Sequence, residues 1–237
     1  MALLNRLALV TGANRGIGLE IASALASEGC DLVMTARDGK TLLQAARKIE
    51  KLGVRVLVQT CDVRSPESVD HLFTLVRALR RPLDFLINNA GIGHPNRPVT
   101  ELPYPMWQGV IETNLTGMFL VTQAALAVMK QGSVIVNNLS IAAERVFPGS
   151  AAYNASKHGA LGFTDTLREE LRPKRIRVIA LMPGATDTDI WKTLWPKAPR
   201  GKMMSAATVA QTVVDALLLP ANSAVEKLIV MPAVGAL

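Results

Sequence analysis

Hydrophobic and polar positions alternate along the chain between short β-branched apolar runs and longer stretches with helical spacing. The short runs are typical of buried strands. They lie at residues 6–11, 31–36, 54–60, 84–88, 134–140, 176–181 and 227–231. The helical stretches lie between them, at residues 17–27, 41–52, from 65 onward, 107–130, 151–171 and 205–219. This alternation predicts a parallel sheet with helices on both faces and right-handed crossovers.

The apolar content of the chain fits one domain with a continuous core. Hydrophobic residues make up 49% of the 237 residues, enough for a doubly covered sheet. No stretch reaches the roughly 18 consecutive apolar residues of a membrane span, and the first residues enter a strand pattern without a signal peptide. Cys30 and Cys61, the two cysteines, lack metal-site spacing. We expect a single domain over residues 1–237 that is cytoplasmic and has neither a membrane partner nor a metal.

The net charge of +7 fits three kinds of partner: nucleic acid, an acidic carrier protein or a phosphate-rich cofactor. The basic residues are dispersed, with only short pairs such as Arg80-Arg81. No basic stripe interleaved with aromatic residues occurs, so the sequence does not predict nucleic-acid binding.

A glycine-rich turn follows the first predicted strand and precedes the first predicted helix. Its glycines, Gly12, Gly16 and Gly18, are spaced G-x-x-x-G-x-G. Such a turn brings backbone amides and a helix N-terminus up to phosphate oxygens, and a side chain there would block the approach. We expect dinucleotide contacts from Gly12, Asn14, Arg15, Gly16, Ile17 and Gly18.

The end of the second predicted strand indicates which dinucleotide binds. NAD-binding folds of this kind carry an acidic residue there that takes the ribose hydroxyls, whereas this chain has Ala36 followed by Arg37. Arg15 lies in the glycine turn, and two guanidinium groups near the adenosine ribose suit a 2′-phosphate. The sequence therefore predicts NADP(H) over NAD(H). In the alternative, Arg37 is only solvated and Asp38 takes the acid's place.

Three residues around the fifth predicted strand form a candidate catalytic group. Ser140 ends that strand, at the sheet edge where open α/β folds hold ligands. Tyr153 and Lys157 are four residues apart on the next predicted helix, so they share one face. An ammonium one turn from a phenol favours the phenolate, and we expect the pKa of Tyr153 to lie below its usual value of about 10.

Ser140 with Tyr153-x-x-x-Lys157, the glycine spacing and Asn88-Asn89-Ala90-Gly91 together resemble the short-chain dehydrogenase/reductase family. The resemblance covers nearly the whole chain, with the motifs in the family's order. It implies an α/β fold, a doubly wound (Rossmann-type) parallel sheet of seven strands in the order 3-2-1-4-5-6-7. It also implies a homodimer or homotetramer formed through the helices near 107–130 and 151–171.

The resemblance assigns further residues to the site. Asp62 would accept from the adenine amino group, with Val63 packing nearby. Asn89, Ala90 and Gly91 would line the cofactor channel, and Asn114 would kink its helix and hold a water that connects to Lys157. The remaining cofactor contacts implied are Pro183, Gly184, Thr186 and Thr188.

We expect reversible hydride transfer between NADP(H) and a small-molecule ketone, aldehyde or secondary alcohol. Tyr153 would exchange the proton with the substrate oxygen and contact the cofactor. Lys157 would lower the Tyr153 pKa and bond the nicotinamide ribose, while Ser140 would steady developing negative charge. Asn114 would complete a proton relay through water.

Two alternatives stay open. The basic surface suits an acidic carrier, as a 3-oxoacyl-acyl-carrier-protein reductase would need. The loop at residues 189–204 is apolar and basic. Its Trp191, Leu194 and Trp195 instead fit closure over a bulkier apolar substrate, or plain packing, or a subunit contact. A non-catalytic NADP-sensing interaction protein is the alternative outside enzymes, although such a protein would be expected to have lost the catalytic side chains.

Overall fold

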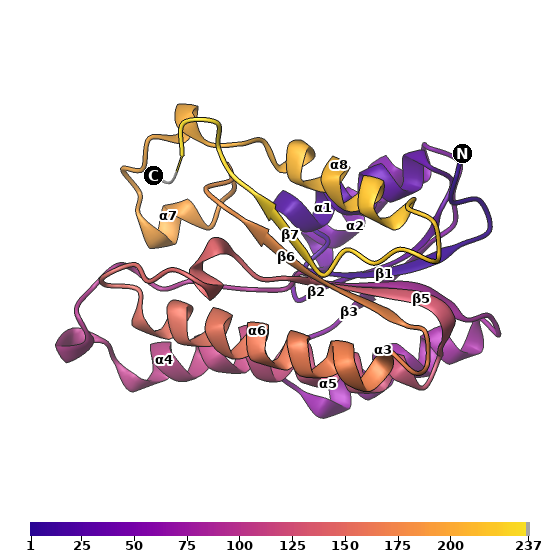
Figure 1. The fold of residues 1–237 in the computed structure, drawn as a ribbon, viewed down its shortest axis with the longest axis horizontal. Helices are drawn as coiled ribbons and strands as arrows, with labels where there is room; N and C mark the ends of the chain where they lie inside the picture. The colour runs from indigo at the N-terminus through magenta and orange to yellow at the C-terminus, as the bar shows by residue number, and fades with distance from the viewer. Residues whose placement is uncertain (236–237) are drawn as a thin grey trace.

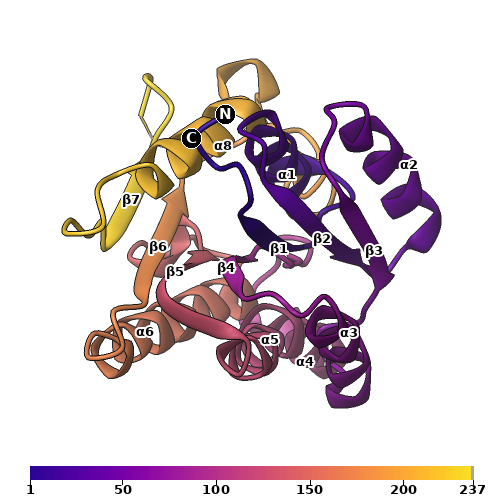
Figure 2. The same cartoon turned by 90° about the vertical axis from the view of Figure 1, so that its right-hand side faces the viewer.

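The computed structural model describes residues 1–235, and within them one parallel sheet of seven strands crosses the molecule. The strands are β1 (Leu7–Thr11), β2 (Asp31–Ala36), β3 (Val56–Thr60), β4 (Leu83–Asn88), β5 (Met129–Asn138), β6 (Arg177–Pro183) and β7 (Lys227–Val230). Their order is β3-β2-β1-β4-β5-β6-β7 (Figure 2), which confirms the predicted order.

Helices cover both faces of the sheet, as the alternating pattern predicts (Figure 1). On one face lie α1 (Gly16–Ser27), α2 (Gly39–Glu50) and α8 (Ala206–Leu217). On the other lie α3 (Pro66–Ala78), α4 (Tyr104–Ile111), α5 (Gly117–Leu126) and α6 (Ala151–Leu171). The chain is therefore doubly wound, and consecutive strands are joined by crossovers rather than hairpins.

Each face of the sheet has its own apolar core, because successive strand residues point to opposite faces. In β2, Met34 joins Leu42 of α2 in one buried cluster, whereas Val33 joins Phe73 of α3 in the other. All four side chains are almost fully buried. The two cores fix the sheet from both sides and leave its ends free.

The helix predicted over 107–130 is interrupted and shorter than expected. A π-helical turn at Glu112–Thr116 separates α4 from α5, and α5 ends at Leu126. The strand begins at Met129, because Met129 pairs with Leu83 before the ladder shifts its register. The apolar run around residues 125–129 fits a buried helix or a buried strand equally well, which is why its periodicity predicted the wrong boundary.

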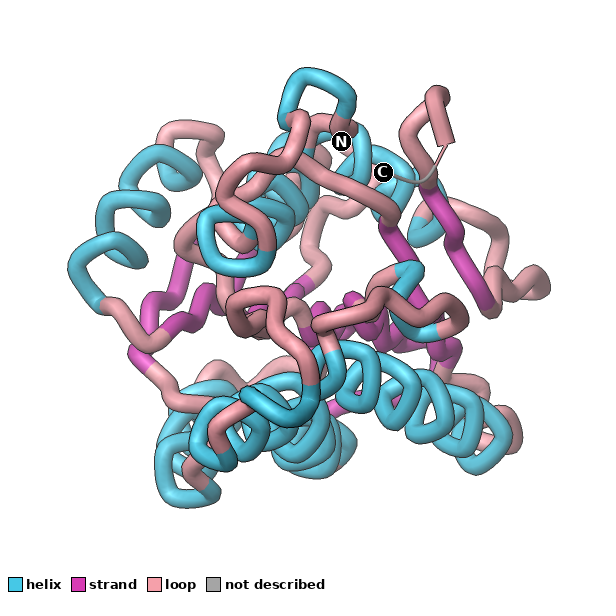
Figure 3. Tube along the Cα trace, turned by 90° about the vertical axis from the view of Figure 1, so that its left-hand side faces the viewer, coloured by secondary structure: helices cyan, strands magenta, loops and turns pink. Residues whose placement is uncertain are grey.

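The segment predicted as a long loop after β6 is partly ordered into helical turns. It contains α7 (Trp191–Leu194) and a 3₁₀ turn at Arg200–Lys202. A parallel bridge between Thr186 and Met204 closes the segment at its base. We call residues 186–204 the flap. It lies over the carboxyl ends of the strands, the edge that faces the viewer in Figure 3.

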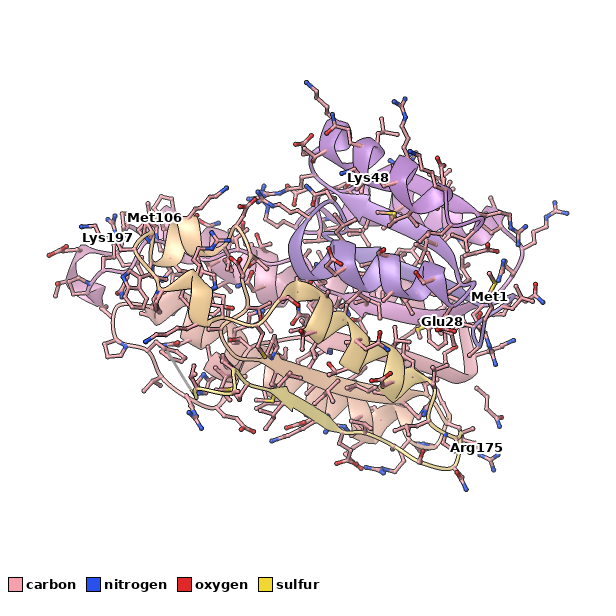
Figure 4. All side chains as sticks on the ribbon, turned by 90° about the horizontal axis from the view of Figure 1, so that it is seen from above. Met1, Glu28, Lys48, Met106, Arg175 and Lys197 are labelled. Atoms are coloured by element: carbon pink, nitrogen blue, oxygen red, sulfur yellow. The ribbon has the colours of Figure 1, made fainter. Side chains whose placement is uncertain are left out.

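The two ends of the sheet lie toward opposite ends of the molecule's long axis. Figure 4 shows Lys197 of the flap at one end, together with Met106, and Arg175, Met1 and Glu28 at the opposite end. Because Arg175 precedes β6 and the flap follows it, the carboxyl edge is the Lys197 end.

No helix within residues 1–235 is both long and apolar enough to cross a membrane.

Candidate active site

A cavity of about 740 Å³ opens at the carboxyl edge of the sheet. Its walls come from the glycine turn, the residues that follow β2, β4, β5 and β6, the start of α6, and the flap. Ligands of open α/β sheets bind at this edge, outside the carboxyl ends of the strands. Of the residues predicted for the site, all line the cavity except Gly18, Asp62 and Asn114.

The glycine turn is shaped to approach an anion closely. Gly12 and Gly16 have φ of 63° and 57°, a region that favours glycine. Gly16 and Ile17, in the first turn of α1, line the cavity, and the Arg15 side chain makes no capping hydrogen bond to that turn. The positive end of the helix is therefore available to an anion in the cavity.

Gly18 acts through packing and does not line the cavity. A Cβ atom on Gly18 would lie 2.2 Å from Nδ2 of Asn89 and 2.5 Å from the Gly12 carbonyl oxygen. Asn89 itself donates from Nδ2 to the carbonyl oxygens of Thr11 (2.9 Å) and Gly12 (3.2 Å). The absence of a side chain at Gly18 therefore allows Asn89, at the end of β4, to pack against the glycine turn.

The adenosine end of the cavity carries two exposed arginines. Arg15 and Arg37 both line it. Asp38, the residue that could take the acid's place, accepts hydrogen bonds from the amides of Lys40 and Thr41 as the N-cap of α2. The hydrogen bonds to Thr41 and Lys40 hold the pKa of Asp38 below its usual value. The Asp38 carboxylate thus already accepts hydrogen bonds from the first turn of α2.

Ser140, Tyr153 and Lys157 converge on one wall of the cavity. Ser140 lies close enough to Tyr153 to lower the pKa of its phenol. Lys157 is 5% exposed, its Nζ donates to the Asn138 carbonyl oxygen at 3.0 Å, and it lies 5.5 Å from the centre of the Tyr153 ring. The helical spacing of four thus places the amine beside the phenol ring, as predicted.

The expected lowering of the Tyr153 pKa is wrong for the polypeptide alone. Burial raises the pKa of Tyr153 above its usual value, and the nearby Ser140 hydroxyl offsets only part of that rise. Burial also lowers the pKa of Lys157 to about 8. The sequence spacing shows that the two groups are neighbours, but it does not show how strongly the fold withdraws both from water.

Asn114 lies behind the cavity wall, in the π-helical turn. Its Oδ1 accepts from the Ile92 amide at 2.8 Å, and its Nδ2 donates to the Ile92 carbonyl oxygen and to Oγ of Ser156. A Cβ atom on Gly91 would lie 3.4 Å from Oδ1 of Asn114 and 3.8 Å from Nζ of Lys157. Asn114 and Lys157 therefore flank Gly91, and the part of Asn114 in a water relay stays a prediction.

Asn138 is a site residue that the sequence analysis missed. Its Nδ2 donates to Oδ1 of Asn89 at 2.8 Å, while its carbonyl oxygen accepts from Lys157. Asn89 in turn holds the Gly12 carbonyl oxygen. A chain of hydrogen bonds thus joins the glycine turn to the buried amine. The signal was an asparagine inside an otherwise apolar strand, which needs a polar partner when buried.

The adenine contact expected from Asp62 and Val63 stays a prediction. Val63 lines the cavity, whereas Asp62 does not. The Asp62 carboxylate is bound by Arg64, with Nη2 to Oδ2 at 2.6 Å, and this interaction holds the pKa of Asp62 below its usual value. On the other side, Thr188 comes within 3.3 Å of a Cβ placed on Gly16, so the start of the flap rests on the glycine turn.

Several lining residues had no signal in the sequence pattern. They come from the segment between β5 and α6 and from the segment after β7, and are Ile141, Ala142, Phe147, Pro148, Ser150 and Met231. Irregular segments carry no period, so only the fold reveals which of their side chains face the cavity.

Comparison with known proteins gives a consistent result. A family model described as short chain dehydrogenase matches residues 6–199. A putative ketoacyl reductase of Streptomyces coelicolor is 36% identical over 233 residues, covering 88% of each chain. A 3-oxoacyl-acyl-carrier-protein reductase of Synechocystis is 37% identical over 197 residues, covering 81% of this chain and 79% of the relative.

A solved structure extends the likeness to the whole fold. It is an alcohol dehydrogenase from the archaeon Thermococcus sibiricus complexed with 5-hydroxy-NADP. Its TM-score is 0.89 at 30% identity, and the match covers 96% of this chain and 97% of that one.

Gly18→Ala should destabilise the protein by about 1–3 kcal/mol, because the added methyl group meets backbone and a held amide. Gly162→Ala is the control: it lies inside α6 with nothing within 4 Å of its Cβ position, and should stabilise by about 0.5–1 kcal/mol. Urea unfolding measures both. A Gly18→Ala protein as stable as the parent would contradict the packing described here.

Proposed function

Because the chain belongs to the short-chain dehydrogenase/reductase family, we propose that it is a cytoplasmic oxidoreductase of the carbonyl reductase or alcohol dehydrogenase type. The reaction is reversible hydride transfer between NADP(H) and a ketone, aldehyde or secondary alcohol. The observation that carries the proposal is the convergence of Ser140, Tyr153 and Lys157 in one cavity with the glycine turn.

The residues of the cavity fit NADP(H). The open amides at the start of α1 and the close approach at Gly12 and Gly16 suit the diphosphate. Arg15 and Arg37 suit a 2′-phosphate, and Asp38 is occupied in capping α2. The solved alcohol dehydrogenase with a modified NADP supports the same assignment. Ala90, Gly91, Thr186 and Thr188 form the wall that would hold the nicotinamide half.

When bound, the nicotinamide supplies a hydride to the carbonyl carbon, or accepts one from the alcohol. During reduction Tyr153 gives its phenolic proton to the carbonyl oxygen, so the carbonyl becomes an alcohol and the phenol a phenolate. The Lys157 ammonium lies beside the ring and stabilises that phenolate. Ser140, which lines the same cavity as Tyr153, donates to the substrate oxygen. In oxidation each proton transfer reverses.

The phenolate must regain a proton before the next turnover. The Lys157 ammonium lies beside the Tyr153 ring and can supply that proton, and Asn114 lies near Lys157 across Gly91. We assign Asn114 to a relay that carries protons from water to Lys157. Asn114 is 1% exposed, so it acts from behind the wall and through Lys157.

A 3-oxoacyl-thioester reductase is the second candidate, and the two bacterial relatives favour it. The net charge of +7 also suits an acidic carrier protein. An assay with an acetoacetyl thioester beside a simple aryl ketone distinguishes the two reactions. Measurable reduction of either removes a purely NADP-sensing role.

We also propose that the enzyme is a homodimer or homotetramer. The first of the two helical segments expected to form the contact carries the exposed large apolar side chains Trp107 and Phe119. Exposed apolar groups on neighbouring helices are typical of subunit interfaces.

Tyr153→Phe should keep NADPH binding but reduce kcat by at least about 100-fold, because the proton donor is gone while the ring still fills its place. Tyr104→Phe is a matched control, since Tyr104 is the chain's other tyrosine and is 71% exposed. NADPH oxidation with a ketone measures turnover, and NADPH fluorescence measures binding. Unchanged turnover in Tyr153→Phe would refute the proposed mechanism.

Arg37→Asp should lower kcat/KM for NADPH by about 10- to 100-fold and raise the relative use of NADH, because a carboxylate repels a 2′-phosphate and accepts from ribose hydroxyls. The parent should prefer NADPH. Steady-state kinetics with each cofactor checks both expectations. A parent enzyme that prefers NADH would contradict the assignment of the arginines.

A further inference from the structure

One end of the cavity is enclosed by three segments that hold one another: residues 91–97, residues 147–150 and the flap. The amide of Asn96 donates to the Leu194 carbonyl oxygen at 3.3 Å, and the amide of Arg97 donates to the Gly149 carbonyl oxygen at 3.0 Å. A Cβ atom on Gly93 would lie 2.5 Å from Cδ2 of Leu194, so α7 rests directly on this segment. We call this region the substrate end.

The substrate end adjoins the catalytic residues. Its first segment starts at Gly91, where a Cβ atom would lie 3.8 Å from Nζ of Lys157. Its second segment leads directly into α6, with the amide of Ser150 bonded to the Phe147 carbonyl oxygen, just before Tyr153. A carbonyl held by Ser140 and Tyr153 therefore has its substituents between these segments and the flap.

Apart from Asp189 of the flap, the residues that line the substrate end are apolar or neutral. The apolar lining residues are Ile92, Ile141, Phe147, Leu194 and Trp195, and the polar ones are Asn96, Ser150 and Thr193. Trp191 is fixed by its own hydrogen bond, from Nε1 to the Thr186 carbonyl oxygen at 2.8 Å. Trp195 is 45% exposed, which leaves an aromatic surface at the mouth that a substrate can cover.

The charged residues that line the cavity either lie outside the substrate end or are already paired with other protein groups. Within residues 1–235 they are Arg15, Arg37, Asp38, Lys157 and Asp189. The two arginines and Asp38 belong to the glycine turn and the end of β2. Asp189 pairs with Arg15 at 3.7 Å and with Lys192 at 2.6 Å. Lys157 donates to Asn138. Arg97 of the first segment and the basic residues of the flap are not among the lining residues. The described lining of the substrate end thus offers no cation to a substrate carboxylate.

We propose that the substrate is an uncharged ketone with a bulky apolar substituent, and that 2-oxo and 3-oxo acids are rejected in their ionised form. Burial of a carboxylate without a cation or several donors is costly. An ester or thioester of the same acid keeps the shape and removes that cost. The inference rests on the proposed reductase activity and defines which carbonyl compounds that site accepts.

A matched pair of ketones tests the proposal on the full-length protein with NADPH. Methyl benzoylformate and the benzoylformate anion differ in one methyl group and one charge. We expect kcat/KM for the ester to exceed that for the anion by at least about 100-fold. Equal rates, or a preference for the anion, would overturn the proposal while leaving the reductase activity intact. No reduction of either compound or of an acetoacetyl thioester would overturn the proposed function as well.

A cation placed in the substrate end gives a second test. Thr193 lines the cavity from α7 and is exposed, so Thr193→Arg is compatible with folding. It should narrow the ester-to-anion ratio by about tenfold, chiefly by lowering KM for the anion. Thr74→Arg, on the exposed face of α3, is the matched control and should leave the ratio unchanged. An unchanged ratio in Thr193→Arg would count against the proposal.

Discussion

The buried amine of Lys157 is the group on which the site depends. A charged amine that is 5% exposed is costly unless the fold supplies a partner. Here the Asn138 carbonyl oxygen accepts from it, and the Tyr153 ring lies within cation–π distance. The hydrogen bond also joins α6 to the end of β5. Because α6 carries both Tyr153 and Lys157, this hydrogen bond holds the phenol at the end of β5 and keeps the ammonium beside it.

This arrangement explains why the two halves of the site act together. The amides of Asn89 and Asn138 link the glycine turn to Lys157. A shift of the glycine turn would therefore displace the Lys157 amine, and a shift of the amine would displace the turn. Gly18 makes the link possible, since any larger residue would push Asn89 out of place. The cofactor half and the catalytic half are one hydrogen-bonded unit.

The sequence predicted the fold well because its signals are periodic. The alternation of strands and helices follows from the apolar runs, whereas the strand order was implied by the resemblance to the family. Asn138 was missed because its partner, Asn89, is 49 residues away in the chain. The π-helical turn at Glu112–Thr116 was not predicted as such, because one extra residue in a helix hardly changes its apolar pattern.

Other differences arise from burial and competition between partners. Spacing placed Lys157 beside Tyr153, but the rise in the Tyr153 pKa comes from desolvation, which depends on the whole fold. The carboxylate of Asp62, which was expected to meet adenine, is bound by Arg64 two residues away, a contact that the resemblance did not indicate. The lining from Phe147 and Pro148 belongs to a segment without a period, so its orientation is a property of the tertiary structure.

The most direct test of this account is the pH dependence of kcat/KM for ketone reduction between pH 6 and 10. With a pKa of about 8, Lys157 is charged below that pH and neutral above it. The charge stabilises the phenolate that forms as Tyr153 gives up its proton, so the account predicts a rate that is constant at low pH and falls as pH rises through about 8. A rate that stays constant up to pH 10 would contradict the central part assigned to the buried amine.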